Sequence, residues 1–210
     1  MTRVAWPSLK RSLVAILRGV KPDEIEGIGT ALIEEGFEAI EIPLNSPDPF
    51  ASIEILAELA PAGVLVGAGT VLTEEDVDRL NDVGGRLFVA PNVNPPVIQR
   101  AASHGMVTMP GVFTASEALA AVAAGASGLK FFPASILGAA GIKAIRAVLP
   151  PDIEVGAVGG VSEKEFAEYA AVGIRSFGMG SSLYAPDMGA VEVRQRAKKT
   201  IAAYDTVFTK

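Results

Sequence analysis

The chain has 210 residues, a hydrophobic fraction of 50% and a formal net charge of −6. This length is enough for one sizeable core, and the acidic balance argues against a nucleic-acid partner, because phosphate backbones bind basic surfaces. The chain has no cysteine and a single histidine, His104, which excludes disulfides, thiolate nucleophiles and cysteine-ligated metals and argues against a multi-histidine zinc site. Any site chemistry must therefore use lysine, carboxylates, arginine, hydroxyls and backbone amides. The sequence also lacks an N-terminal apolar signal segment and any long apolar run, so we expect a soluble, cytoplasmic protein with no membrane association.

Short β-rich segments alternate with longer amphipathic segments along the chain. Strands are predicted at residues 13–17, 39–43, 64–70, 86–92, 106–111, 128–133, 153–160 and 175–182, each followed by a helical pattern. Helix starts are predicted at Thr73, Thr114 and Ser162, because a hydroxyl there precedes a carboxylate within the first helical turn.

This alternation of strands and helices predicts a parallel sheet. Eight strand–helix units without a break in composition favour one closed (β/α)8 barrel, a single domain over residues 1–210. A doubly wound open sheet is the alternative, but about six strands and a switch in strand order are expected there. The segment before Leu13, with Trp6 and Leu9, is predicted to form a short N-terminal helix that plugs the bottom of the barrel.

The charged residues at the predicted carboxyl ends of the strands are the main candidates for a site, because barrels of this kind place their sites there. These residues are Arg18, Glu41 and Lys130. In a strand, alternate side chains face opposite sides of the sheet. Apolar residues flank Glu41 and Lys130 on both sides, so if those neighbours face the helices, Glu41 and Lys130 both point into the barrel.

A buried lysine suggests amine chemistry. Desolvation and a nearby cation favour the neutral amine, which can attack a ketone to form a Schiff base. A carboxylate such as Glu41 can then move the protons. Two structural alternatives stay open: Glu41 and Lys130 could form a buried ion pair, and Arg18 could be a surface residue instead of a clamp on a substrate carboxylate.

Small residues at the other strand ends complete the predicted site. Gly159-Gly160 and Gly180-Ser181 follow the seventh and eighth strands, where barrels of this kind commonly bind phosphate through backbone amides. Thr70 and Pro91 end the third and fourth strands and are also predicted to bind substrate, although Thr70 could instead cap the next helix.

Seven motifs resemble one enzyme family. They are AILRG, AIEIPLNSP, GAGTV, PGVFT, LKFFPAS, AVGGV and GMGSSLY, in order from about Leu13 to Tyr184, and they resemble the class I aldolases of 2-keto-3-deoxy-6-phosphosugar acids. The resemblance implies a homotrimeric (β/α)8 barrel without metal or cofactor that cleaves a phosphosugar acid to pyruvate and glyceraldehyde 3-phosphate. It also implies that Lys130 is the Schiff-base lysine, Glu41 the general acid/base and Arg18 the residue that binds the pyruvate carboxylate.

Two departures bear on which sugar acid is cleaved. Members of the gluconate branch usually carry threonine before the glycine pair, where this chain has Val158, and T-L-R-T or T-F-T after the glutamate of strand two, where this chain has EIPLNSP. Both departures resemble the galactonate branch, which implies a role in galactonate catabolism. A gluconate or hydroxyglutarate aldolase is the alternative, and a non-catalytic phosphosugar-binding barrel is an alternative of another class. Intact Lys130 and Glu41 argue against the latter.

Overall fold

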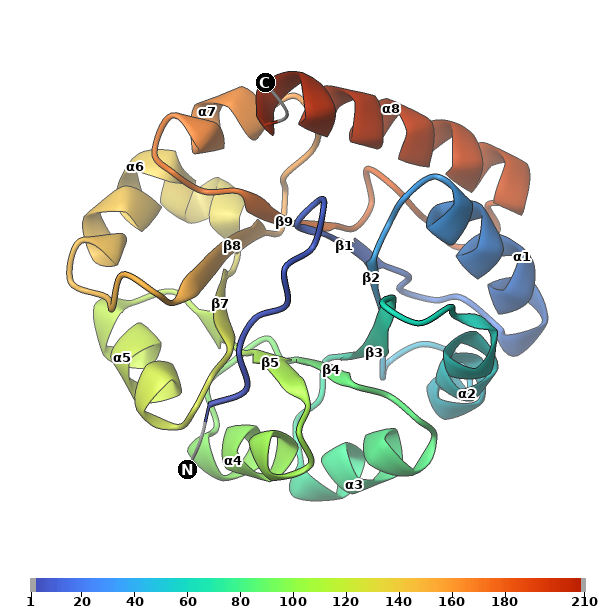
Figure 1. The fold of residues 1–210 in the computed structure, drawn as a ribbon, viewed down its shortest axis with the longest axis horizontal. Coiled ribbons are helices and arrows are strands. Elements are labelled where there is room, and N and C mark those ends of the chain that lie inside the picture. The colour runs from blue at the N-terminus through green and yellow to red at the C-terminus, as the bar shows by residue number, and fades with distance from the viewer. Residues whose placement is uncertain (1–2, 209–210) are drawn as a thin grey trace.

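In the computed structural model, which describes residues 3–208, a parallel sheet is surrounded by helices (Figure 1). The strands are β1 (Leu13–Ile16), β2 (Ala39–Pro43), β3 (Leu65–Gly69), β4 (Leu87–Val89), β5 (Val107–Met109), β6 (Gly111–Val112), β7 (Gly128–Phe131), β8 (Glu154–Val158) and β9 (Ser176–Met179). The helices are α1 (Pro22–Glu34), α2 (Pro49–Leu59), α3 (Glu74–Asp82), α4 (Pro95–Ser103), α5 (Ala115–Ala123), α6 (Ala134–Arg146), α7 (Phe166–Ala170) and α8 (Ala190–Phe208). Every strand falls within a predicted strand region, except that β6 extends one residue beyond it, to Val112.

The sheet closes into a barrel. Its strand order is β5-β4-β3-β2-β1-β9-β8-β7-β6, and only Pro110, which has no backbone N–H to donate, separates β5 from β6. Hydrogen bonds from the Ser127 amide to the Thr108 carbonyl and from the Lys130 amide to the Pro110 carbonyl, both 3.0 Å, join this broken strand to β7. The two ends of the sheet therefore meet in one interrupted strand, and the prediction of a (β/α)8 barrel is confirmed.

Two of the three predicted helix starts are confirmed. The Thr73 and Thr114 hydroxyls accept hydrogen bonds from the amides of Asp76 and Glu117, at 3.1 and 3.2 Å, and cap α3 and α5. The prediction at Ser162 is wrong, because α7 begins only at Phe166. There the Glu165 carboxylate accepts hydrogen bonds from both the amide and the hydroxyl of Ser162, which closes a separate turn before the helix.

The predicted N-terminal helix is also wrong. Residues 3–12 contain no helix and run across one end of the barrel (Figure 1). Trp6 and Leu9 nevertheless pack against the buried side chains inside the barrel, and Trp6 lies beside Gly128, the first residue of β7. Pro7 breaks the segment, and its apolar side chains fill the amino-terminal end of the barrel without regular structure.

The apolar side chains form two layers. The larger core lies between strands and helices and includes Ile40, Ile42, Leu129 and Phe131. The smaller core fills the barrel and consists of Val14, Ala39, Leu87, Val89, Val107 and Met109. Because the residues on either side of Glu41 in β2 and of Lys130 in β7 pack against the helices, the Glu41 and Lys130 side chains face the barrel axis.

No helix within residues 3–208 is long and apolar enough to cross a membrane.

Candidate active site

Glu41 and Lys130 lie inside the barrel, as the strand alternation predicts. Their side chains share a small space with Val14, Val89 and Met109. Glu41 is 1% exposed and Lys130 is 6% exposed. The two charged groups therefore sit in an apolar enclosure at the carboxyl side of the inner core.

Gly69 gives the Glu41 carboxylate its position. It pairs with Pro43 in the register of β2 and β3. A Cβ atom on Gly69 would lie 1.8 Å from Glu41 Oε2 and 2.4 Å from Cδ, far inside the contact distance. The GAGT motif thus supplies a strand end without a side chain at the point where the carboxylate needs space.

Burial shifts the pKa values of Glu41 and Lys130 in opposite directions, and in each case it favours the uncharged form of the side chain. Desolvation raises the pKa of Glu41 to about 7, although the positive charges of Lys130 and Arg18 act in the opposite direction. Desolvation lowers the pKa of Lys130; the negative charge of Glu41 opposes this shift and Arg18 adds to it. The site therefore favours a usable amine beside a carboxyl group that titrates near neutral pH.

No structural ion pair occupies these groups. Glu41 Oε2 is buried without a hydrogen-bond partner in the described chain, and no ion pair joins Glu41 to Lys130 among residues 3–208. Lys130 Nζ instead lies 4.9 Å from the centroid of the Phe132 ring. A buried polar atom without a partner is costly, and this one can accept a hydrogen bond from a bound molecule.

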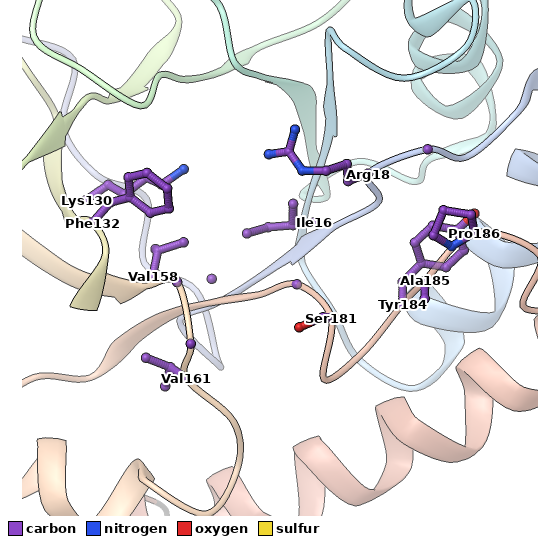
Figure 2. Close-up of a pocket in the computed structure, with 15 residues that line it drawn as sticks. Ile16, Arg18, Lys130, Phe132, Val158, Val161, Ser181, Tyr184, Ala185 and Pro186 are labelled. Atoms are coloured by element: carbon purple, nitrogen blue, oxygen red, sulfur yellow. The ribbon is translucent and has the colours of Figure 1, made fainter. Parts of the chain in front are cut away.

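Lys130 also lines a larger cavity of about 390 Å³, whose lining residues are drawn in Figure 2. Seven of the predicted site residues line it: Arg18, Lys130, Val158, Gly159, Gly160, Gly180 and Ser181. Glu41 lies in the adjoining small space, which also includes Lys130 and Val158. A volume of this size suits a small organic acid.

Thr70 and Pro91 do not line the larger cavity. Thr70 has a positive φ of 56°, so its backbone turns sharply after β3. The backbone of Pro91 lies against Gly111, where a Cβ atom would be 2.4 Å from the Pro91 carbonyl. The substrate-binding role of these two residues stays a prediction.

The two glycine loops form one wall of the cavity. Gly159 and Gly160 have φ values of 90° and 73°, and a Cβ atom on Gly160 would lie 2.5 Å from Ser135 Oγ. No backbone hydrogen bond is found for the Gly160 and Ser181 amides within the described residues. Free amides beside a serine hydroxyl are suited to an anion such as a phosphate group.

Arg18 approaches the cavity from the loop after β1, opposite Lys130 in the close-up (Figure 2). Its Nη1 donates a hydrogen bond to Oδ1 of Asn45, and it has no carboxylate partner among residues 3–208. A guanidinium whose charge is not compensated can bind a carboxylate of a small molecule.

Several residues of the cavity wall were not predicted from the sequence, namely Ile16, Gly19, Phe132, Val161, Gly178, Tyr184, Ala185 and Pro186. Strand phase could have found two of them, since Phe132 lies two residues after Lys130 and Ile16 lies two before Arg18. Gly178 lies within β9, two residues before Gly180, and Val161 follows the Gly159-Gly160 pair after β8. The remaining residues depend on how the loops after β1 and β9 meet: a Cβ atom on Gly19 would lie 2.8 Å from Pro186 Cγ.

The fold and the cavity define a (β/α)8-barrel protein with a buried amine and a buried carboxyl group at the carboxyl end of its strands. The family model "KDPG and KHG aldolase" matches residues 8–198, and the chain belongs to this family. Proteins of this family are class I aldolases, which need no metal.

Related proteins agree with this assignment. The chain is 69% identical to the "Probable 2-dehydro-3-deoxy-6-phosphogalactonate aldolase" of Rhizobium meliloti, over 99% of this chain and 98% of the relative. It is 45% identical to the "2-dehydro-3-deoxy-6-phosphogalactonate aldolase" of Escherichia coli, over 93% and 95%. A solved structure described as "Native KDPGal structure" superposes with a TM-score of 0.95 at 43% identity, over 98% of this chain and 100% of that chain.

Proposed function

We propose that the chain cleaves 2-dehydro-3-deoxy-6-phosphogalactonate to pyruvate and glyceraldehyde 3-phosphate through a Schiff base on Lys130. The observation that carries the proposal is the buried Lys130 amine, which lines the cavity and shares an apolar space with an unpartnered Glu41 carboxyl group. The names of the two relatives with the galactonate substrate support the choice of sugar acid.

The chemistry follows from the positions of these groups. The neutral Lys130 amine attacks the C2 ketone, and loss of water leaves a protonated imine. The Glu41 carboxylate takes the proton of the C4 hydroxyl, the C3–C4 bond breaks, and its electron pair moves into the imine to give an enamine and glyceraldehyde 3-phosphate. Protonation of the enamine at C3 and hydrolysis of the imine release pyruvate and restore the amine.

The cavity wall supplies the binding groups. Arg18 would hold the substrate carboxylate near Lys130. The loops with Gly160 and Ser181 would hold the phosphate at the other end of the substrate, through amides and one hydroxyl. Thr70 and Pro91 would contribute from the rim. We propose in addition that the enzyme is a homotrimer and acts in the cytoplasm in galactonate catabolism; both proposals rest on the family resemblance.

Val158 bears on the stereochemistry at C4. Its side chain is 6% exposed and lines both the cavity and the space beside Glu41. A Cβ atom on Gly178 would lie 2.8 Å from each Val158 methyl group, so the side chain is closely confined. An apolar wall selects an epimer by shape, whereas a hydroxyl can select it by a hydrogen bond.

The experiment is to measure kcat/KM for the galactonate and gluconate epimers side by side, in the wild type and in Val158→Thr. We expect the wild type to prefer the galactonate epimer incompletely. Threonine is nearly isosteric, so the variant should move the ratio toward the gluconate epimer by about tenfold, the worth of one hydrogen bond. A wild type that prefers the gluconate epimer would overturn the substrate, and an unchanged ratio would remove Val158 as the selector.

A further inference from the structure

Two hydrogen bonds join the loop that carries Arg18 to the loop after β2. Arg18 Nη1 donates a hydrogen bond to Asn45 Oδ1, and the Gly19 amide donates one of 2.9 Å to Ser46 Oγ. Both contacts are made by the LNSP segment, residues 44–47, directly after the strand that carries Glu41. The loops that follow β1 and β2 are thus joined at the edge of the cavity.

The contact to Ser46 fixes the backbone. Ser46 is buried, and its own amide donates to the Pro43 carbonyl at 2.9 Å, so the hydroxyl is held in place. Gly19 has a φ of 88° and lies so close to Pro186 that no Cβ atom fits. The backbone next to Arg18 is therefore set from two sides.

The contact to Asn45 joins two exposed side chains, and it orients the Arg18 guanidinium while leaving its charge free. Arginine only donates hydrogen bonds, so the oxygen of the amide must face it. A neutral acceptor orders the guanidinium without compensating its charge, whereas a carboxylate at this place would pair with it. The positive charge of Arg18 also acts on the two groups inside the barrel. It opposes the rise of the Glu41 pKa that burial causes, and it adds to the lowering of the Lys130 pKa.

We propose that Asn45 is a positioning residue that orients Arg18 toward the substrate carboxylate while it keeps the arginine charge uncompensated, and that Ser46 supports it by fixing Gly19. This inference rests on the proposed function, since it needs a carboxylate substrate. Asn45 acts only through Arg18 and does not line the cavity.

Two variants of Asn45 distinguish the orientation of the Arg18 guanidinium from the compensation of its charge. Asn45→Ala removes the acceptor, so we expect KM for the sugar acid and the inhibition constant of pyruvate to rise about fivefold, with kcat within about twofold of the wild type. Asn45→Asp keeps the shape and adds a charge that pairs with Arg18. We expect a rise of about tenfold or more in both constants and a shift of the acid limb of kcat/KM to higher pH, because the added negative charge raises the Glu41 pKa.

The control is Asn81→Asp at the end of α3, where the Asn81 Oδ1 atom likewise accepts a hydrogen bond from an arginine, Nη1 of Arg86 at 3.2 Å, and where neither residue lines the cavity; it should leave both constants unchanged. A second readout needs no substrate: ¹⁵N relaxation of the Arg18 Nε–H group should show an ordered guanidinium in the wild type and a mobile one in Asn45→Ala.

These readouts distinguish the inference from the proposed function. If the wild type cleaves no phosphosugar acid, the proposed function fails, and the relaxation experiment still tests whether Asn45 orders Arg18. An equally ordered Arg18 in Asn45→Ala, constants within twofold of the wild type in both variants, or a fall in kcat with unchanged KM would overturn the inference.

Discussion

Gly69 holds open the space that the Glu41 carboxylate occupies, so Gly69→Ala tests the position of this group without changing its chemistry. The added Cβ atom would lie 1.8 Å from Oε2 and 2.6 Å from Oε1. The backbone of Gly69 lies within β3 and does not have a positive φ, so alanine is compatible with the chain conformation. The carboxylate must move, and the proton transfer that depends on its position must become slower.

The magnitude has two parts. Displacement of a general acid/base removes about 10²–10⁴-fold in rate, so kcat should fall by at least about 100-fold. Overpacking a buried site costs about 1–3 kcal/mol, which for a chain of this length lowers Tm by roughly 2–12 °C. The variant should therefore stay folded at room temperature and be nearly inactive.

The assay is kcat for the galactonate epimer, measured beside a thermal melt. The matched control is Gly189→Ala, where a Cβ atom meets nothing within 4 Å, and which should change neither quantity. If the loss acts through Glu41, the double variant Gly69→Ala/Glu41→Gln should be no slower than Glu41→Gln alone. A folded Gly69→Ala with kcat within about threefold of the wild type would refute the role given to Glu41.

Three further predictions concern the phosphate, the pH dependence of the activity and the pH dependence of the stability. Ser181→Ala removes a hydroxyl donor from the cavity wall and should raise KM about tenfold or more for the phosphorylated substrate; an equal loss with the unphosphorylated sugar acid would contradict phosphate binding. Because the Glu41 pKa is raised to about 7, kcat/KM should fall as the pH drops below about 7, and a limb near pH 4.5 would contradict the effect of burial. The same raised pKa means that the folded protein binds more protons than the unfolded one between about pH 4.5 and 7, so the free energy of unfolding should decrease as the pH rises through this range; Glu41→Gln should weaken that slope, as urea titrations can show.

The sequence predicted the barrel and the inward orientation of Glu41 and Lys130 because both follow from local periodicity. Alternation within a strand depends only on neighbours, and the carboxyl ends of parallel strands share one edge. The same reasoning placed Arg18, Val158 and the two glycine loops together at the cavity.

The wrong or missing predictions have a different origin, because the features concerned depend on contacts between different segments of the chain. No local pattern shows that Trp6 and Leu9 fill the barrel without a helix, or that Glu165 closes a turn with Ser162 before α7 begins. The hydrogen bond of Asn45 to Arg18 likewise depends on how two loops meet. Side-chain contacts between loops are set by the whole fold and not by the propensity of either segment.

Trapping with pyruvate and borohydride tests the central claim most directly, since reduction fixes a Schiff base on the lysine that forms it. Lys130 lies buried in the cavity, whereas Lys143 on α6 is exposed. Intact mass and peptide mapping should show one reduced pyruvyl group, on Lys130, and Lys130→Arg should remove both the adduct and the cleavage activity while the fold is retained. An adduct on Lys143 or another lysine with Lys130 unmodified, or no adduct at all, would contradict the account.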